Sequence, residues 1–458
     1  MTRLRDMQSQ CVSRLFACIF SRPVGFTMTF CQRAAAPPVT QTDLRELLVR
    51  ASLSLAWFVD SRSKVPSLTA FDAQLAHSGS SPPASPSAAP LRILATSAAA
   101  GTMLAAEVAS PTAVPALSDA ISSTVSAFNQ AVVMHRDPVD PTRPLWAHLS
   151  AAAMKEPRSS VAHSSILIVA LVSCPSASAW GHLVAPLADG ITRLQLDDGT
   201  FQVYFDDPGS DIGWELYGTQ AALGVALASL FIASSNDRAA AALAHVAWRA
   251  VQAYQHRFTS CGVRASCAVF FLNWLTQAAH ATSQAMAALG DEATARAAAD
   301  MGCELADSLA SHSGPLHGAL ADPSGAATVE VACALEGVAD ALSMATRQGD
   351  THRVGLFERA ARAGVAHLTR VQAASRECAA GGKLPVGAAY GFGASLSAPG
   401  NQRCDVIAHA ITALVKLLPL AAREPGGTTP VTPDAVSPEM MTRAEQREQH
   451  IESPHSDP

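Results

Sequence analysis

Apolar residues recur at helical spacing along most of this chain. The clearest segment is 237–258, where they follow the i, i+3, i+4, i+7 pattern of one buried helical stripe and where Asp237 is suited to be the N-cap. The same spacing predicts eleven more helices after residue 90 and one before it. These other predicted helices are 42–59, 91–108, 113–135, 143–155, 159–173, 178–196, 212–234, 264–289, 291–313, 326–347, 351–374 and 402–420.

Twelve consecutive helices with short connections bury their apolar stripes only if neighbouring helices pair. A closed ring of six helical hairpins satisfies all of them, so we predict an all-α fold, an (α/α)6 toroid over residues 91–420. An open helical-repeat solenoid is the structural alternative. In the ring, the longer connecting loops surround a funnel at one end, where a ligand is expected to bind.

The segments outside this body have other patterns. Residues 40–76 form a predicted N-terminal helical segment, 77–90 a Pro/Ser-rich linker whose prolines remove backbone donors, and 421–458 a polar tail expected to be disordered. Residues 1–39 carry five arginines against one aspartate, a charge of +4, which predicts a transit segment and a mitochondrial location. Secretory entry and an unprocessed N-terminus are the alternatives.

Composition supports a packed helical protein, because 49% of the residues are hydrophobic, 15% are charged and only 5% are aromatic. Without residues 1–39 the net charge of −6 becomes −10, and an acidic body argues against nucleic-acid binding. The longest apolar run in this body, 166–172, has seven residues, so no membrane span is predicted. The ten cysteines include no CxxC pair and are expected to be mostly reduced core thiols.

The loop 193–217 carries the densest group of acids, with five aspartates and Glu215 inside nineteen residues. Turn and cap roles account for most of the aspartates, and Asp211 is expected to cap a helix that begins at Ile212. Trp214 beside Glu215 at a helix start suits stacking on a sugar ring next to a carboxylate. A short strand is also compatible with 202–205.

A second candidate group is Arg403, Asp405 and His409. The aspartate and histidine are four residues apart and share one helix face, so they suit a catalytic pair, a polar lining of the funnel or a structural ion pair. A metal site needs three or four ligands, and no further His or Cys has the spacing to complete one. We therefore predict no metal and no cofactor.

Polar residues also interrupt two apolar helices. Asn273, Trp274 and Gln277 lie in one, and Glu336 with Asp340 lies in the other. Such groups face a cavity or satisfy a neighbouring helix. For two acids four residues apart, a solvated helix face is the ordinary interpretation.

Five blocks of residues together resemble the six-hairpin glycosidase and epimerase-like (α/α)6 domains. The blocks are Gln195-x-x-Asp198-Gly199-x-Phe201, Gly213-Trp214-Glu215-Leu216-Tyr217, Phe270-Phe271-Leu272-Asn273-Trp274 with Gln277, Thr328 to Gly337, and Arg403-x-Asp405-x-x-x-His409-Ala410. The resemblance spans about residues 160 to 420. It implies the toroid fold and a saccharide substrate. The first block is also similar to repeats of terpene cyclases and prenyltransferases, but their aspartate-rich motifs and zinc ligands are absent from this sequence.

These observations together predict a carbohydrate-active enzyme, either a glycoside hydrolase or a sugar epimerase, that works through paired carboxylates. The expected catalytic residues are Glu215 and Asp405. The residues expected to bind a small-molecule or saccharide substrate are Trp214, Asn273, Trp274, Gln277, Glu336, Arg403 and His409. The alternative is a non-catalytic toroid module for binding or assembly in an organelle. The sequence leaves the oligomeric state open.

Overall fold

Helices make up most of the structure, in agreement with the all-α class predicted from the apolar spacing. The computed structural model describes residues 41–62, 129–136, 138, 140, 144–150, 158–173, 177–311, 314–316, 326–381, 392–393, 395–397, 399 and 404–421. All of them belong to one compact unit, Val39–Pro458. The predicted transit segment, the linker, the helix at 91–108 and nearly all of the tail lie outside the described residues.

The helix bounds follow the predicted segments closely. The described helices are α2 (Gln41–Arg62), α6 (Val161–Ser173), α7 (Ala177–Thr192), α8 (Trp214–Ile232), α9 (Asp237–Cys261), α10 (Ala265–Ala288), α11 (Glu292–Ala310), α13 (Thr328–Gln348), α14 (Thr351–Ala380) and α15 (Cys404–Ala421). Two predicted N-caps were wrong. Asn236 rather than Asp237 caps α9, since its side chain accepts from the Ala239 amide, and α8 begins after Gly213, which has no side chain to accept a hydrogen bond.

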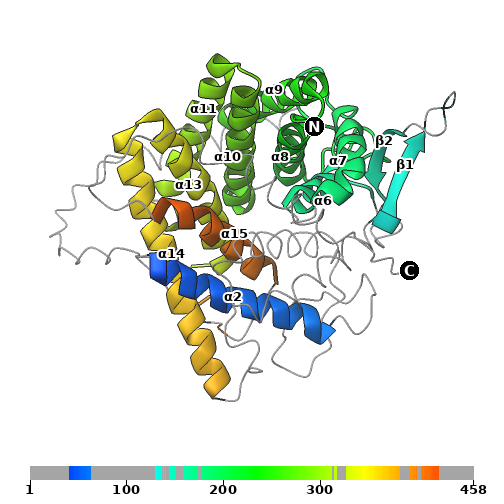
Figure 1. The fold of residues 1–458 in the computed structure, drawn as a ribbon. Coiled ribbons are helices and arrows are strands. Elements are labelled where there is room, and N and C mark those ends of the chain that lie inside the picture. Colours follow the sequence, from blue (N-terminus) through cyan, green and yellow to red (C-terminus); the bar gives the residue numbers. More distant parts are fainter. Residues whose placement is uncertain are drawn as a thin grey trace, which may run out of the picture. The chain divides into compact units, whose positions relative to one another are not determined.

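The helices form an inner row with outer partners (Figure 1). In the inner row α6 contacts α8, α8 contacts α10, α10 contacts α13, and α13 contacts α15, which in turn contacts α2. The outer helices α7, α9, α11 and α14 each pack against the inner helix that precedes them in the chain. Inner helix α10 is buried along most of its length, whereas outer helix α9 buries one stripe, as expected for two layers of helices.

Two predicted helices were wrong over most of their described residues. In the segment 113–135, residues 129–131 are helical, but the chain then forms the strand β1 (Val132–Arg136). The segment 143–155 contributes β2 (Pro144–Leu149), which pairs antiparallel with β1, with Val132 opposite Leu149. Ala147 and Leu149 are buried while Trp146 and His148 are only half-buried, and β2 packs against α7. This period of two belongs to a strand with one covered face, and a short apolar run does not distinguish it from a helix.

One described helix, α8, is long and apolar enough to span a membrane, but 67% of its most apolar window is buried within the protein. Five cysteines whose side chains are described form no disulfide: Cys267, Cys303 and Cys333 are buried, Cys378 is half-buried and Cys261 is exposed.

Candidate functional site

Three inner helices, α10, α13 and α15, carry polar side chains that meet in the interior. On each helix these residues recur at intervals of three, four or seven, so that they lie on one face. Most are almost completely buried. We call this group the interhelical polar cluster; its members are Asn273, Gln277, His280, Cys333, Glu336, Asp340, His409 and Lys416.

Glu336 lies at the centre of one half of the cluster. Its Oε2 accepts hydrogen bonds from Asn273 Nδ2 (3.1 Å) and Gln277 Nε2 (3.3 Å), and lies 3.0 Å from His409 Nδ1. Burial lowers the pKa of His409, but the adjacent Cys333 and Glu336 outweigh it and hold that pKa well above the ordinary histidine value. The structure therefore holds a carboxylate and an imidazolium together in the interior.

Asp340 lies at the centre of the other half. Lys416 Nζ donates to Asp340 Oδ2 (2.8 Å), and His280 Nδ1 lies 3.1 Å from Asp340 Oδ1. Burial raises the pKa of Asp340, but Lys416 and His280 reverse this effect and leave it lowered. Gln277 joins the halves, because its Oε1 accepts from Lys416 (2.7 Å) while its Nε2 donates toward Glu336. The solvated-face interpretation of Glu336 and Asp340 was wrong: each is buried beside cationic or donor groups from other helices.

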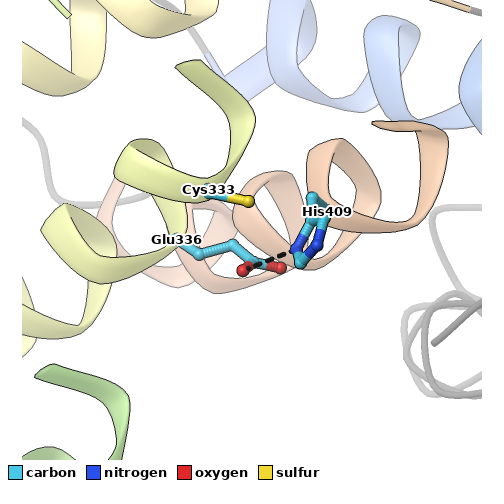
Figure 2. A group of neighbouring side chains, drawn as sticks. All are labelled: Cys333, Glu336 and His409. Atoms are coloured by element: carbon cyan, nitrogen blue, oxygen red, sulfur yellow. Dashed lines mark hydrogen bonds and ion pairs between the residues drawn. The ribbon is translucent and has the colours of Figure 1, made fainter. Parts of the chain in front are cut away.

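Sequence reasoning missed three members of this cluster: His280, Lys416 and, beside Glu336 and His409, Cys333. Cys333 lies one turn before Glu336 on α13, and Figure 2 shows its sulfur directed toward the His409 ring and the Glu336 carboxylate. The three possible ligand atoms lie within 4.8 Å of one another. A cysteine in an apolar helix is ordinarily a small core residue, so only its spacing of three from Glu336 was available as a signal.

Five of the residues predicted to bind substrate come together here. Asn273, Gln277, Glu336 and His409 belong to the cluster, and the Trp274 ring meets the His409 ring edge-on at a centroid distance of 5.8 Å.

Glu215 and Trp214 lie at the start of α8 and make different contacts. Glu215 forms a two-point ion pair with Arg264, at 2.7 and 2.9 Å, which lowers the pKa of this carboxyl. Arg257 lies 3.9 Å above the Trp214 ring, and Tyr254 stacks with it at 6.5 Å. Among the described contacts, neither residue interacts with the interhelical polar cluster.

The remaining predicted residues adjoin α15. Arg403 lies outside the described residues, as does the side chain of Asp405, whose backbone is in the first turn of α15, one turn before His409. The pairing of Glu215 with Asp405 therefore stays a prediction.

Three aspartates of the acidic loop make local or anchoring contacts. Asp198 accepts from the Thr200 amide and hydroxyl, Asp206 accepts from the Ser159 amide, and Asp207 pairs with Arg158 at 2.7 Å. The short strand at 202–205 is reduced to a single bridge between Tyr204 and Ser160. The Asp198 contacts agree with a turn role, whereas Asp206 and Asp207 connect the loop to the residues that precede α6.

Comparison with known proteins identifies no family: no protein-family model matches the chain, and no curated protein matches it significantly.

Proposed function

We propose that this protein is a carbohydrate-active enzyme whose reaction centre lies at Glu336 and His409. The observation that carries the proposal is the 3.0 Å contact between His409 Nδ1 and Glu336 Oε2 in the interior of a helical double layer. A carboxylate and an imidazole in contact are the groups that most often transfer protons in enzymes. Asp405, one turn before His409, is the second carboxylate of the proposed centre.

The surrounding groups suit a ligand rich in hydroxyls. The amides of Asn273 and Gln277 each offer both donors and an acceptor, and Trp274 brings an aromatic ring to the same side of α10. Aromatic rings and amides in a few fixed positions are typical of small-molecule sites. The substrate class that we propose is a saccharide, hydrolysed or epimerised.

The proposed architecture is the (α/α)6 toroid. The inner row from α6 to α15 and the outer helices packed behind it support repeated helical hairpins. We further propose that this row of helices closes into a ring. Within such a ring, α10, α13 and α15 are inner helices and their polar cluster belongs to the central side.

Turnover of a saccharide panel by the full-length protein tests the proposal, with product release and epimer formation followed by NMR. We expect Glu336→Gln to reduce turnover by about 100-fold or more, as for the loss of a proton-transfer group. Glu330→Gln, on the same helix but outside the cluster, is the control. The variant Glu215→Ala tests in the same assay whether Glu215, rather than Glu336, is the carboxylate that turnover requires. Full activity of a folded Glu336→Gln variant, or no turnover and no saccharide binding, would overturn the proposal.

The alternative is a non-catalytic binding or assembly module. The observation that favours it is that the cluster residues satisfy one another, as they do in a purely structural network. Saccharide binding without turnover would support this alternative. For the location, we propose mitochondrial import directed by residues 1–39, with the secretory pathway as the alternative; import of a fusion of residues 1–39 to a reporter tests this.

A further inference from the structure

We propose that Cys333, Glu336 and His409 bind one divalent metal ion of intermediate softness, of which Zn²⁺ is the representative. The proposal uses the residues of the proposed reaction centre but does not depend on which substrate the protein processes. With an ion bound, Glu336 and His409 would serve as its ligands, so the proton transfers proposed above belong to the metal-free protein. It departs from the prediction, drawn from the sequence, that the protein binds no metal.

The three side chains supply the ligand set that such an ion prefers. Thiolate, imidazole and carboxylate are the usual zinc ligands, at bond lengths that place ligand atoms about 3.4 Å apart around a tetrahedral ion. His409 Nδ1 and Glu336 Oε2 are 3.0 Å apart, and the whole set of ligand atoms falls within 4.8 Å. Small side-chain rotations therefore bring the three atoms around one ion. Among the described residues, this is the one group of three or more such side chains that meets these distances.

Two helices fix this arrangement. Cys333 and Glu336 are three residues apart on α13, so they project from the same face, and His409 comes from the facing helix α15. The exposed fractions are 0% for Cys333, 2% for Glu336 and 5% for His409. The ligands are therefore held in a dry interior before any ion arrives, which reduces the cost of ordering them.

The charges balance with the ion present. With a divalent ion, thiolate and carboxylate supply two negative charges and the imidazole is neutral, so the occupied site carries no net charge. An ion therefore enters without leaving an uncompensated charge in the interior.

Neighbouring hydrogen bonds orient the carboxylate. Asn273 and Gln277 both donate to Glu336 Oε2, and Gln277 is itself held by Lys416. Groups that hold a ligand in this way commonly change metal affinity by 10- to 100-fold when removed, as an order of magnitude. With three protein ligands, one coordination position stays open for a water or a substrate oxygen.

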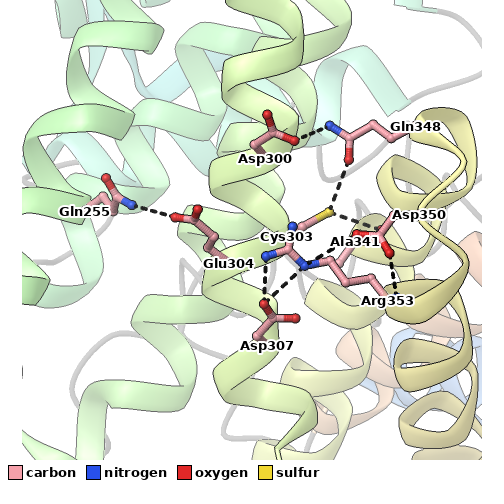
Figure 3. A network of polar contacts seen from close by, with 9 residues as sticks. All are labelled: Gln255, Asp300, Cys303, Glu304, Asp307, Ala341, Gln348, Asp350 and Arg353. Carbon is pink, nitrogen blue, oxygen red and sulfur yellow. Dashed lines mark hydrogen bonds and ion pairs between the residues drawn. The ribbon is translucent and has the colours of Figure 1, made fainter.

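Cys303 provides a matched control. It is as buried as Cys333, but its sulfur lies near the Ala341 carbonyl (3.8 Å) and the Gln348 side chain (4.0 Å), in a network anchored by Arg353 and Asp307 (Figure 3). Burial raises the pKa of the Cys303 thiol to about 12, so it stays protonated. No histidine belongs to the network drawn around it.

The test is a titration of the chelator-treated full-length protein with Co²⁺, followed by the near-ultraviolet thiolate-to-cobalt charge-transfer band, together with elemental analysis of the protein as purified. We expect one equivalent of Co²⁺ to produce the band and Zn²⁺ to displace it. Cys333→Ser is expected to abolish the band, Asn273→Ala to weaken binding on the order of 10- to 100-fold, and Cys303→Ser to leave it unchanged.

The proposal is overturned if the wild-type protein gives no thiolate band at one equivalent of Co²⁺, or if folded Cys333→Ser retains it. The wild-type titration decides the matter even if a variant fails to fold. Saccharide turnover without metal binding would remove this inference and leave the proposed function standing. Metal binding without saccharide turnover or saccharide binding would remove the proposed function and leave this inference standing.

Discussion

His409 lies with its Nδ1 3.0 Å from the Oε2 of Glu336, although 73 residues separate the two in the chain. Both side chains are buried, and each belongs to a different inner helix. Because a buried charge is stable only beside a partner, this contact ties the packing of α15 on α13 to the chemistry of the site.

Removing the carboxylate of Glu336 is expected to destabilise the fold. In Glu336→Ala, the imidazolium of His409 and the amides of Asn273 and Gln277 lose their common acceptor, and the loss of one partner of a buried ion pair costs about 3–5 kcal/mol. Denaturant unfolding measures the change. Glu330→Ala, half-exposed on the same helix, is expected to cost less than about 1 kcal/mol. Equal costs for the two variants would contradict the buried pairing.

The pair Asp340 and Lys416 is expected to be energetically coupled. Lys416 Nζ donates to Asp340 Oδ2 at 2.8 Å, and the carboxylate is buried while the ammonium is one quarter exposed. A double-mutant cycle with Asp340→Asn and Lys416→Met is expected to give a coupling free energy of about 1–3 kcal/mol. Additive effects of the two substitutions would show that the contact contributes nothing to stability.

Gly218 is expected to tolerate no side chain. A Cβ at this position of α8 would collide with the hydroxyl of Tyr254, which also accepts a hydrogen bond from the Phe201 amide at 2.9 Å. Gly218→Ala therefore displaces a buried ring and is expected to cost about 1–3 kcal/mol.

Gly355→Ala is the matched control for this substitution. A Cβ at Gly355 on α14 would touch only the end of the Arg359 side chain, at 3.5 Å. Higher helix propensity is expected to make this variant more stable by about 0.5–1 kcal/mol. Thermal unfolding of both variants checks the pair, and a stabilised Gly218→Ala protein would show that the contact with Tyr254 is wrong.

Stability is expected to fall between pH 6.5 and 4 because of His163. Burial lowers the pKa of this histidine from 6.5 to about 4 in the folded protein. Below pH 6.5 the unfolded chain therefore binds a proton that the folded chain does not, so unfolding becomes easier as the pH falls, by about 1.4 kcal/mol per unit until pH 4.

The variant His163→Leu removes this group and is expected to flatten the stability profile over that range. The exposed His256→Leu on α9 changes the histidine count without removing a buried ring and is the control. The measurement is the unfolding free energy of the wild type and of both variants at several pH values between 4 and 6.5. An unchanged slope in His163→Leu would contradict the assignment.

The sequence by itself determined the helices. Apolar spacing located α8 to α15 to within a few residues at most ends, because an amphipathic stripe is a property of a single helix and can be recognised locally. It also singled out Asn273, Gln277, Glu336 and His409 as polar residues in apolar surroundings. It misassigned β1 and β2, whose apolar runs are too short to distinguish a period of two from a helical turn.

Only the tertiary structure decided which stripes face one another. That packing placed Cys333 beside His409, gave Asp340 its partner Lys416, and directed Glu215 to Arg264. The spacing of Asp405 and His409 could not reveal a three-residue centre, since the other members come from a different helix. The physical reason is that periodicity records which side of a helix is buried, whereas a site depends on the contacts between helices, which form when the chain packs.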